Sequence, residues 1–132
     1  MSTSIKKPKR IFVVDDEADV ALSLKIVLEK YGFLVDTFTD PAVALKSFDP
    51  QSYDLLILDI KMPGISGFEL YSKMKSKRSF LNLKTLFLTA LKDLENYETY
   101  KENVSPKLGE RHFIQKPVSN TELLKQVYSM VN

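Results

Sequence analysis

The segment Leu55–Leu58 places four large apolar residues in a row, between Tyr53-Asp54 on one side and Asp59 on the other. A strand with one face in water alternates apolar and polar residues, so an unbroken apolar run indicates a strand covered on both faces. Such strands lie in the middle of parallel sheets that carry helices on both sides. Tyr53–Asp59 is therefore predicted as the central strand of an α/β domain.

Four further segments have strand character, and an amphipathic segment follows each of the five. The expected strands are Ile11–Asp15, Phe33–Phe38, Tyr53–Asp59, Leu83–Thr89 and Arg111–Gln115. The expected helices are Asp19–Tyr31, Pro41–Phe48, a third that begins after Ser66, Asp93–Asn103, and a last one that begins after Ser119. Units in this order join parallel strands by right-handed crossovers. The predicted fold is a three-layer (βα)5 doubly wound parallel five-stranded sheet.

Several of the expected helix ends carry local signals. Gly32 stands where a helix C-terminal glycine belongs, and Asp40-Pro41 is a capping residue followed by proline at the first helical position. Ser66 with Glu69, and Ser119 with Glu122, have the spacing of a capping box. These signals support the helix–strand alternation independently of its hydrophobic pattern.

Composition excludes several classes of protein. A chain of 132 residues with 44% hydrophobic and 27% charged residues fits one folded domain and excludes a disordered chain. Cysteine is absent and His112 is the single histidine, which excludes a disulfide scaffold and a multi-histidine metal site. No apolar run approaches the roughly 18 residues of a membrane span, and the N-terminus has no signal-peptide core. A cytoplasmic protein without membrane contact is expected.

The net charge of +2 comes from the start of the chain, where the first ten residues hold four basic residues and no acid. The rest of the chain holds 15 basic and 17 acidic residues. A nucleic-acid binder is expected to carry its basic excess on a folded face, so no direct contact with nucleic acid is expected here. We interpret residues 1–9 as a solvated basic leader and residues 10–132 as the folded domain.

Polar residues follow four of the expected strands at their C-terminal ends. These residues are Asp15, Asp16, Asp59, Thr89 and Lys116. Ligands of open parallel sheets bind beyond this edge, so the five side chains are expected to converge on one site. Clustered carboxylates repel one another unless a cation lies between them, and oxygen ligands favour Mg²⁺ over zinc.

The same residues are sufficient for phosphorylation of a carboxylate. A carboxylate can attack phosphorus to give an aspartyl phosphate, and a metal ion and a lysine can offset the charge on the phosphoryl oxygens. Each residue also has a purely structural interpretation. Asp15 and Asp16 could cap the first helix, Thr89 could be an ordinary strand residue, and Lys116 could be solvated.

At these positions the sequence resembles the response-regulator receiver domains of two-component signalling, which are chemotaxis-regulator-like domains with a flavodoxin-like fold. The resemblance extends from about Lys9 to Asn132 and rests on four motifs in order. They are Ile11-Phe12-Val13-Val14-Asp15-Asp16-Glu17, Leu56-Ile57-Leu58-Asp59-Ile60-Lys61-Met62-Pro63-Gly64, Phe87-Leu88-Thr89-Ala90 and Ile114-Gln115-Lys116-Pro117. The resemblance implies the strand order 2-1-3-4-5.

The resemblance also implies a role for each matching residue. Asp59 would be the phosphoacceptor. Asp16 would bind Mg²⁺ directly and Asp15 mostly through water, with Asp59 and the backbone carbonyl of Lys61 completing the protein ligands. Thr89 and Lys116 would contact the phosphoryl group. Phe113 matches the aromatic switch position, and the Lys116–Pro117 peptide bond is expected to be cis.

By the same resemblance, a sensor histidine kinase or a phosphotransfer protein supplies the phosphoryl group. Thr89 then moves toward it and Phe113 fills the vacated space, so that the surface of the fourth helix, fifth strand and fifth helix changes. That surface would meet an unknown downstream protein, and a phosphorylation-dependent dimer is an option. The chain would not be an enzyme in the ordinary sense, since it would only phosphorylate itself and slowly dephosphorylate itself.

Three alternatives remain open from the sequence. The first is an enzyme: a phosphatase with an aspartyl nucleophile is disfavoured because no Asp stands two residues after Asp15 or Asp16, and a nucleotide hydrolase is disfavoured because no P-loop is present. A pseudo-receiver would be a binding module that is never phosphorylated. The third alternative is the receiver half of a truncated DNA-binding regulator, although the lack of a linker favours a stand-alone regulator.

The 27-residue distance from Thr89 to Lys116 is a few residues longer than the family leads us to expect, and the excess falls within Leu91–Gly109.

Overall fold

The computed structural model describes residues 7–76, 83–90 and 111–131. The strands are β1 (Arg10–Val14), β2 (Leu34–Phe38), β3 (Leu55–Asp59), β4 (Lys84–Thr89) and β5 (Arg111–Gln115). The helices are α1 (Ala18–Lys30), α2 (Pro41–Ser47), α3 (Gly67–Lys75) and α5 (Asn120–Val131), with a 3₁₀ turn η1 (Pro50–Ser52). The helix expected over Asp93–Asn103 and the longer segment Leu91–Gly109 lie outside the described residues.

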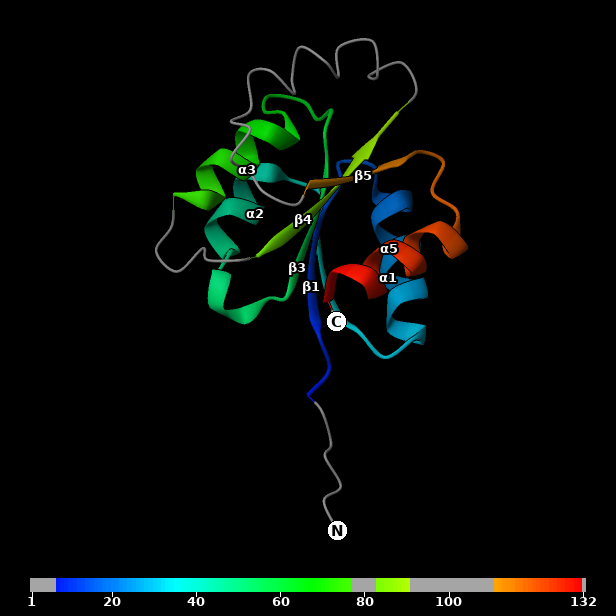
Figure 1. The fold of residues 1–132 in the computed structure, drawn as a ribbon. Coiled ribbons are helices and arrows are strands. Elements are labelled where there is room, and N and C mark those ends of the chain that lie inside the picture. Colours follow the sequence, from blue (N-terminus) through cyan, green and yellow to red (C-terminus); the bar gives the residue numbers. More distant parts are fainter. Residues whose placement is uncertain (1–6, 77–82, 91–110, 132) are drawn as a thin grey trace.

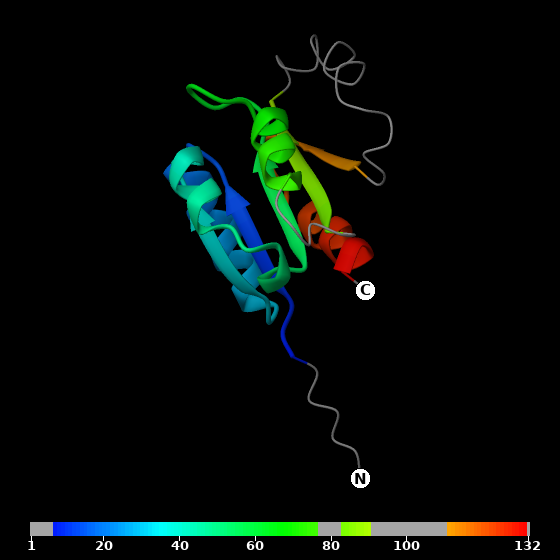
Figure 2. The ribbon, with the colours of Figure 1, turned by 90° about the vertical axis from the view of Figure 1, so that its left-hand side faces the viewer.

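The five strands form one parallel sheet in the order β2-β1-β3-β4-β5. Helices α1 and α5 lie against one face, and α2 and α3 lie against the other (Figure 1). Figure 2 views the molecule from the side of α2 and α3, which stand in front of the strands. The predicted three-layer architecture and strand order are confirmed.

The sheet separates two apolar cores. In β1 and β3, odd-numbered residues such as Ile11 and Ile57 pack toward α1 and α5. Even-numbered residues such as Phe12 and Leu58 pack toward α2 and α3. All five residues of β3 are buried, as the apolar run predicts for the central strand. A shift of the strand by one residue would exchange the side chains that the two cores receive.

The predicted local signals act at the ends of four helices. Gly32 has φ = +92°, and the Asp40 side chain accepts a hydrogen bond from the backbone N–H of Ala42 at the start of α2. Ser66 and Glu69 form a complete capping box at the start of α3. At α5, Ser119 Oγ accepts from the backbone N–H of Glu122 at 3.0 Å.

Gly67, the first residue of α3, lies directly against the end of β3. Its backbone N–H donates to the carbonyl of Ile60 at 2.7 Å, and a Cβ at this position would overlap the backbone carbonyl of Asp59. Helix α3 can therefore approach the end of β3 only because residue 67 has no side chain. The contact holds the backbone at Asp59 between the sheet and the helix.

Replacing this glycine tests the close approach. Gly67→Ala should lower the free energy of unfolding by about 1–3 kcal/mol, because the methyl group would displace the Asp59 backbone. Helix propensity alone predicts the opposite sign, since alanine stabilises a helix relative to glycine by about 1 kcal/mol. Urea unfolding measures the difference. The control is Ser72→Ala, at an exposed position of the same helix, which should change the free energy of unfolding by less than about 0.5 kcal/mol. Equal stability of Gly67→Ala and the parent protein would contradict the proposed overlap.

Candidate functional site

Residues from the C-terminal ends of four strands meet at one edge of the sheet. Asp15 follows β1, Asp59 ends β3, Thr89 ends β4 and Lys116 follows β5. Two backbone hydrogen bonds continue the sheet past the strands: the N–H of Asp15 donates to Phe38 at 3.0 Å, and the N–H of Lys116 donates to Thr89 at 2.7 Å. The backbone of the sheet therefore fixes where these side chains begin.

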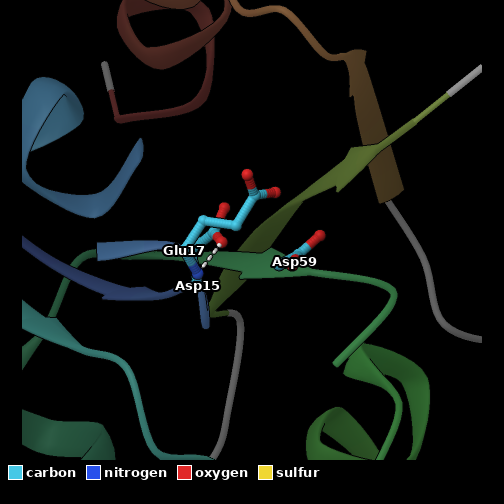
Figure 3. A group of neighbouring side chains, drawn as sticks. All are labelled: Asp15, Glu17 and Asp59. Atoms are coloured by element: carbon cyan, nitrogen blue, oxygen red, sulfur yellow. Dashed lines mark hydrogen bonds between the residues drawn. The ribbon is translucent and has the colours of Figure 1, made fainter. Parts of the chain in front are cut away.

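Asp15 and Asp59 are buried, with 0% and 3% of their surfaces exposed. Figure 3 shows both carboxylates at the same edge of the sheet, together with Glu17. One carboxylate oxygen from each of Asp15, Glu17 and Asp59 lies within 4.8 Å of the other two. Asp15 Oδ1 also accepts a hydrogen bond from the backbone N–H of Glu17 at 2.9 Å, which fixes the orientation of the Asp15 carboxylate.

Lys116 is the cation of this cluster. Its Nζ lies 2.9 Å from Asp15 Oδ2, 2.9 Å from Glu17 Oε1 and 3.4 Å from Asp59 Oδ1. Only 14% of its side chain is exposed. The Lys116–Pro117 peptide bond that follows is cis, as the motif predicts.

Burial strongly perturbs the two aspartates. Desolvation raises the pKa of Asp59 to about 8, with a further contribution from the charge of Asp15, and Lys116 opposes both effects. Desolvation also raises the pKa of Asp15, against the lowering effect of the hydrogen bond from Lys116. For Lys116, burial lowers the pKa, but the carboxylates of Glu17 and Asp15 raise it by more than burial lowers it. The pKa of Lys116 therefore lies above its usual value. Lys116 therefore stays charged.

The remaining predicted site residues surround this centre. Asp16 is half-buried and lines an open cavity of about 410 Å³. The cavity is also lined by Glu17, Asp59, Lys61, Met62, Pro63, Ala90 and Lys116. The Thr89 hydroxyl is buried and donates to the carbonyl of Ala90 at 3.2 Å.

Phe113 lies apart from the cavity, on β5. It is half-buried and stacks on Phe87, with ring centroids 5.4 Å apart and planes at 25°. Phe68 completes this aromatic group, with its ring centroid 6.4 Å from that of Phe113. Because Phe87 lies two residues before Thr89 on the same strand, the aromatic group adjoins the end of β4 at which Thr89 stands.

Sequence reasoning missed Glu17 as a member of the cluster. The sequence offered one signal, because Glu17 follows Asp15-Asp16 directly at the end of β1. The alternative that Asp15 and Asp16 only cap the first helix finds partial support. The N-cap residue of α1 is Glu17, whose side chain makes no capping hydrogen bond. Asp15 bonds the backbone of Glu17, one residue before the helix begins.

The oxygen-rich cluster fits a hard divalent cation. Two buried carboxylates whose pKa values are raised gain most from a nearby positive charge. Asp16 and Lys61 line the same cavity. His112, the single histidine of the chain, lies within strand β5 and is not among the residues that line the cavity. Carboxylates and carbonyls are the ligands of Mg²⁺, Ca²⁺ and Mn²⁺ rather than of zinc or copper.

Comparison with known families identifies this arrangement. The family model described as "Response regulator receiver domain" matches residues 11–128. The chain belongs to the response regulator receiver domains. These domains are the signalling modules of phosphorelays, bind a divalent metal at an aspartate cluster and interact with histidine kinases or phosphotransfer proteins.

Two curated relatives are longer than this chain. A 32% identical match covers 93% of the chain and 48% of the alkaline phosphatase synthesis transcriptional regulatory protein PhoP of Bacillus subtilis. A 31% identical match covers 91% of the chain and 18% of protein RcaC of Microchaete diplosiphon. The chain thus spans about half or less of the length of these curated relatives.

Solved receiver structures match nearly the full length of the chain. A putative response regulator of Chloroflexus aurantiacus is 29% identical, with a TM-score of 0.80, and the match covers 95% of this chain and 98% of that one. The receiver of Methanospirillum hungatei is also 29% identical, with a TM-score of 0.78 and coverage of 95% and 94%. Chemotaxis protein CheY4 of Vibrio cholerae, at 23% identity and a TM-score of 0.80, has the same fold over 94% of this chain and 99% of its own.

None of the helices within the described ranges has the length and hydropathy of a membrane span.

The raised pKa of Asp59 predicts a pH-dependent effect of its removal. Between the usual pKa of 3.8 and about 8, the folded protein holds a proton that the unfolded chain releases, so stability falls as the pH rises through this window. Asp59→Asn removes this loss. Without metal, the variant should be more stable than the parent by about 1–3 kcal/mol at pH 8.

The gain should shrink steadily as the pH is lowered and vanish near pH 4. Urea unfolding in the presence of a chelator, at intervals between pH 4 and pH 8, measures it. Asp19→Asn, at an exposed position of α1, serves as the control for loss of a surface carboxylate. A stability difference for Asp59→Asn that stays constant over this range would contradict the burial of an ionisable carboxylate at this position.

Proposed function

We propose that Asp59 accepts a phosphoryl group from a phosphohistidine of a sensor kinase or a phosphotransfer protein. The observation that carries the proposal is the position of Asp59: its carboxylate lies in the wall of an open cavity, 3.4 Å from the ammonium group of Lys116. An incoming phosphoryl group can reach the carboxylate from the cavity. The relatives named above support a phosphorelay but leave the phosphorylated residue of this chain to be tested.

The transfer exchanges one bond to phosphorus for another. An Asp59 carboxylate oxygen attacks the phosphorus, an O–P bond forms, and the N–P bond of the phosphohistidine breaks, with its electron pair returning to the imidazole. The leaving histidine comes from the partner, so this chain needs no general acid of its own. Asp59 must be ionised to attack. Burial and the charge of Asp15 raise its pKa to about 8, and the positive charge of Lys116 acts in the opposite direction.

The proposed metal is Mg²⁺, held by Asp16 directly, Asp15 mostly through water, Asp59, and the backbone carbonyl of Lys61. Bound Mg²⁺ supplies positive charge that offsets the negative charge on the phosphoryl oxygens during transfer. The protein's own contribution is to hold the carboxylates in place. The Glu17 N–H orients Asp15, and the close packing of Gly67 holds the Asp59 backbone.

Phosphorylation would change the charge at the end of β3 and β4. The phosphoryl group adds roughly one to two negative charges. We infer that the Thr89 hydroxyl leaves the Ala90 carbonyl and donates to a phosphoryl oxygen, and that Phe113 shifts on its stacking partner Phe87 toward the vacated space. The affected output face would include β5 and α5, and the expected fourth helix of this face lies outside the described residues.

Several finer expectations belong to the same proposal. The protein would be cytoplasmic, would not turn over an external substrate, and would meet an unidentified downstream protein through the output face, with a phosphorylation-dependent dimer as one form of response. A DNA-binding output would follow the pattern of the longer relatives only if further chain follows residue 132.

Incubation with acetyl phosphate tests the proposal directly. With Mg²⁺, intact mass should show one phosphoryl group per chain, because the small donor replaces the kinase and the chain's own residues carry out the transfer. A chelator should abolish the adduct. Asp59→Asn should form none, since the amide is not a nucleophile toward phosphorus.

The control variant is Asp54→Asn, which changes an exposed carboxylate at the opposite end of β3 and should be phosphorylated like the parent. Absence of an adduct in the parent protein with Mg²⁺ would contradict the proposal and favour a pseudo-receiver that binds without being phosphorylated.

A further inference from the structure

Glu17 is the one carboxylate of the cluster to which the proposed transfer assigns no direct role. It is the N-cap residue of α1, and 61% of its side chain is exposed at the mouth of the cavity. Its Oε1 accepts a hydrogen bond from Lys116 Nζ at 2.9 Å. The contact joins residues 99 positions apart in the sequence.

The ammonium group of Lys116 has three N–H donors and no acceptor. Three carboxylates surround it: Asp15 and Glu17 at 2.9 Å and Asp59 at 3.4 Å. In the resting structure the ammonium group donates a hydrogen bond to Glu17 and forms ion pairs with Asp15 and Asp59. A phosphoryl oxygen can accept a hydrogen bond from this ammonium group at full strength only if one of the three carboxylates moves away.

The three carboxylates differ in how freely they can withdraw. Asp15 is completely buried and its other oxygen is held by the Glu17 backbone. Asp59 is buried and is the residue that would carry the phosphoryl group. Glu17 has a longer side chain that is mostly in water, so its carboxylate can be rehydrated at small cost. Glu17 is thus the partner that Lys116 can release.

We propose that Glu17 is a positioning residue that holds Lys116 in its resting place and restrains phosphorylation until it releases the lysine to the phosphoryl group. The inference rests on the proposed function of Asp59. Glu17 slows the reaction in two ways that share one origin: its carboxylate occupies a donor of Lys116, and its negative charge stands at the mouth through which an anionic phosphoryl donor enters.

The variant Glu17→Gln tests this role. It keeps the length of the side chain and an acceptor oxygen but removes the charge. Phosphorylation by acetyl phosphate with saturating Mg²⁺ should become about two- to fivefold faster, the range expected when a partly exposed ion pair is broken. Asp19→Asn removes the same charge in the first turn of the same helix, outside the cavity lining, and its rate should equal that of the parent.

The side chain of Lys116 gives a second, independent readout. Its ¹³Cε–¹Hε signal in the NMR spectrum can be assigned by its loss in Lys116→Arg. Without phosphate, this signal should move in Glu17→Gln and stay in place in Asp19→Asn, because Glu17 contacts the ammonium group and Asp19 lies outside the cavity lining. A purely structural role of Glu17 at the start of α1 would leave the signal in place.

The outcomes separate this inference from the proposed function. A Glu17→Gln rate equal to or below that of the parent, or an unmoved Lys116 signal, would overturn the role of Glu17 while leaving Asp59 as phosphoacceptor. A parent protein that forms no adduct at all would overturn the proposed function, and with it the restraint on phosphorylation, whatever the Lys116 signal does.

Discussion

The burial of Asp15 and Asp59 beside each other is the constraint on which this site depends. Two carboxylates in such surroundings repel each other and lose their hydration, and the raised pKa of each records that cost. Lys116 offsets the cost by contacting both. Its strand, β5, is separated from β3 by β4, so the length of the lysine side chain is what brings its charge to the centre of the sheet edge.

Lys116 offsets only part of the negative charge of the carboxylates. The remaining negative charge suits the proposed function. The cluster has more negative than positive charge when its carboxylates are ionised, which favours a divalent cation at the cavity. A structure built only for stability would replace the buried charges by apolar residues. Here the apolar cores on both faces of the sheet supply the stability, and they support the carboxylate cluster at its edge.

The fold was predictable from the sequence because its signals are local and agree with one another. The apolar run of β3, the capping residues Asp40 and Ser66, and the glycine at 32 each mark an element correctly. The strand-end rule placed the aspartates and Lys116 at one edge. The contact of Glu17 with Lys116 was not predictable in this way, because it joins distant segments through two flexible side chains. The turn η1 was missed although Asp49-Pro50 repeats the pattern of Asp40-Pro41, because three residues are too few to show a hydrophobic period.

A crystal structure of the protein with Mg²⁺ and beryllofluoride, a mimic of the phosphoryl group, tests the central claim most directly. We expect the beryllium on an Asp59 carboxylate oxygen, Lys116 Nζ on one fluorine, and the Thr89 hydroxyl on another instead of on Ala90. Beryllofluoride at a different residue, or Lys116 still shared among the three carboxylates with no contact to fluorine, would contradict the account.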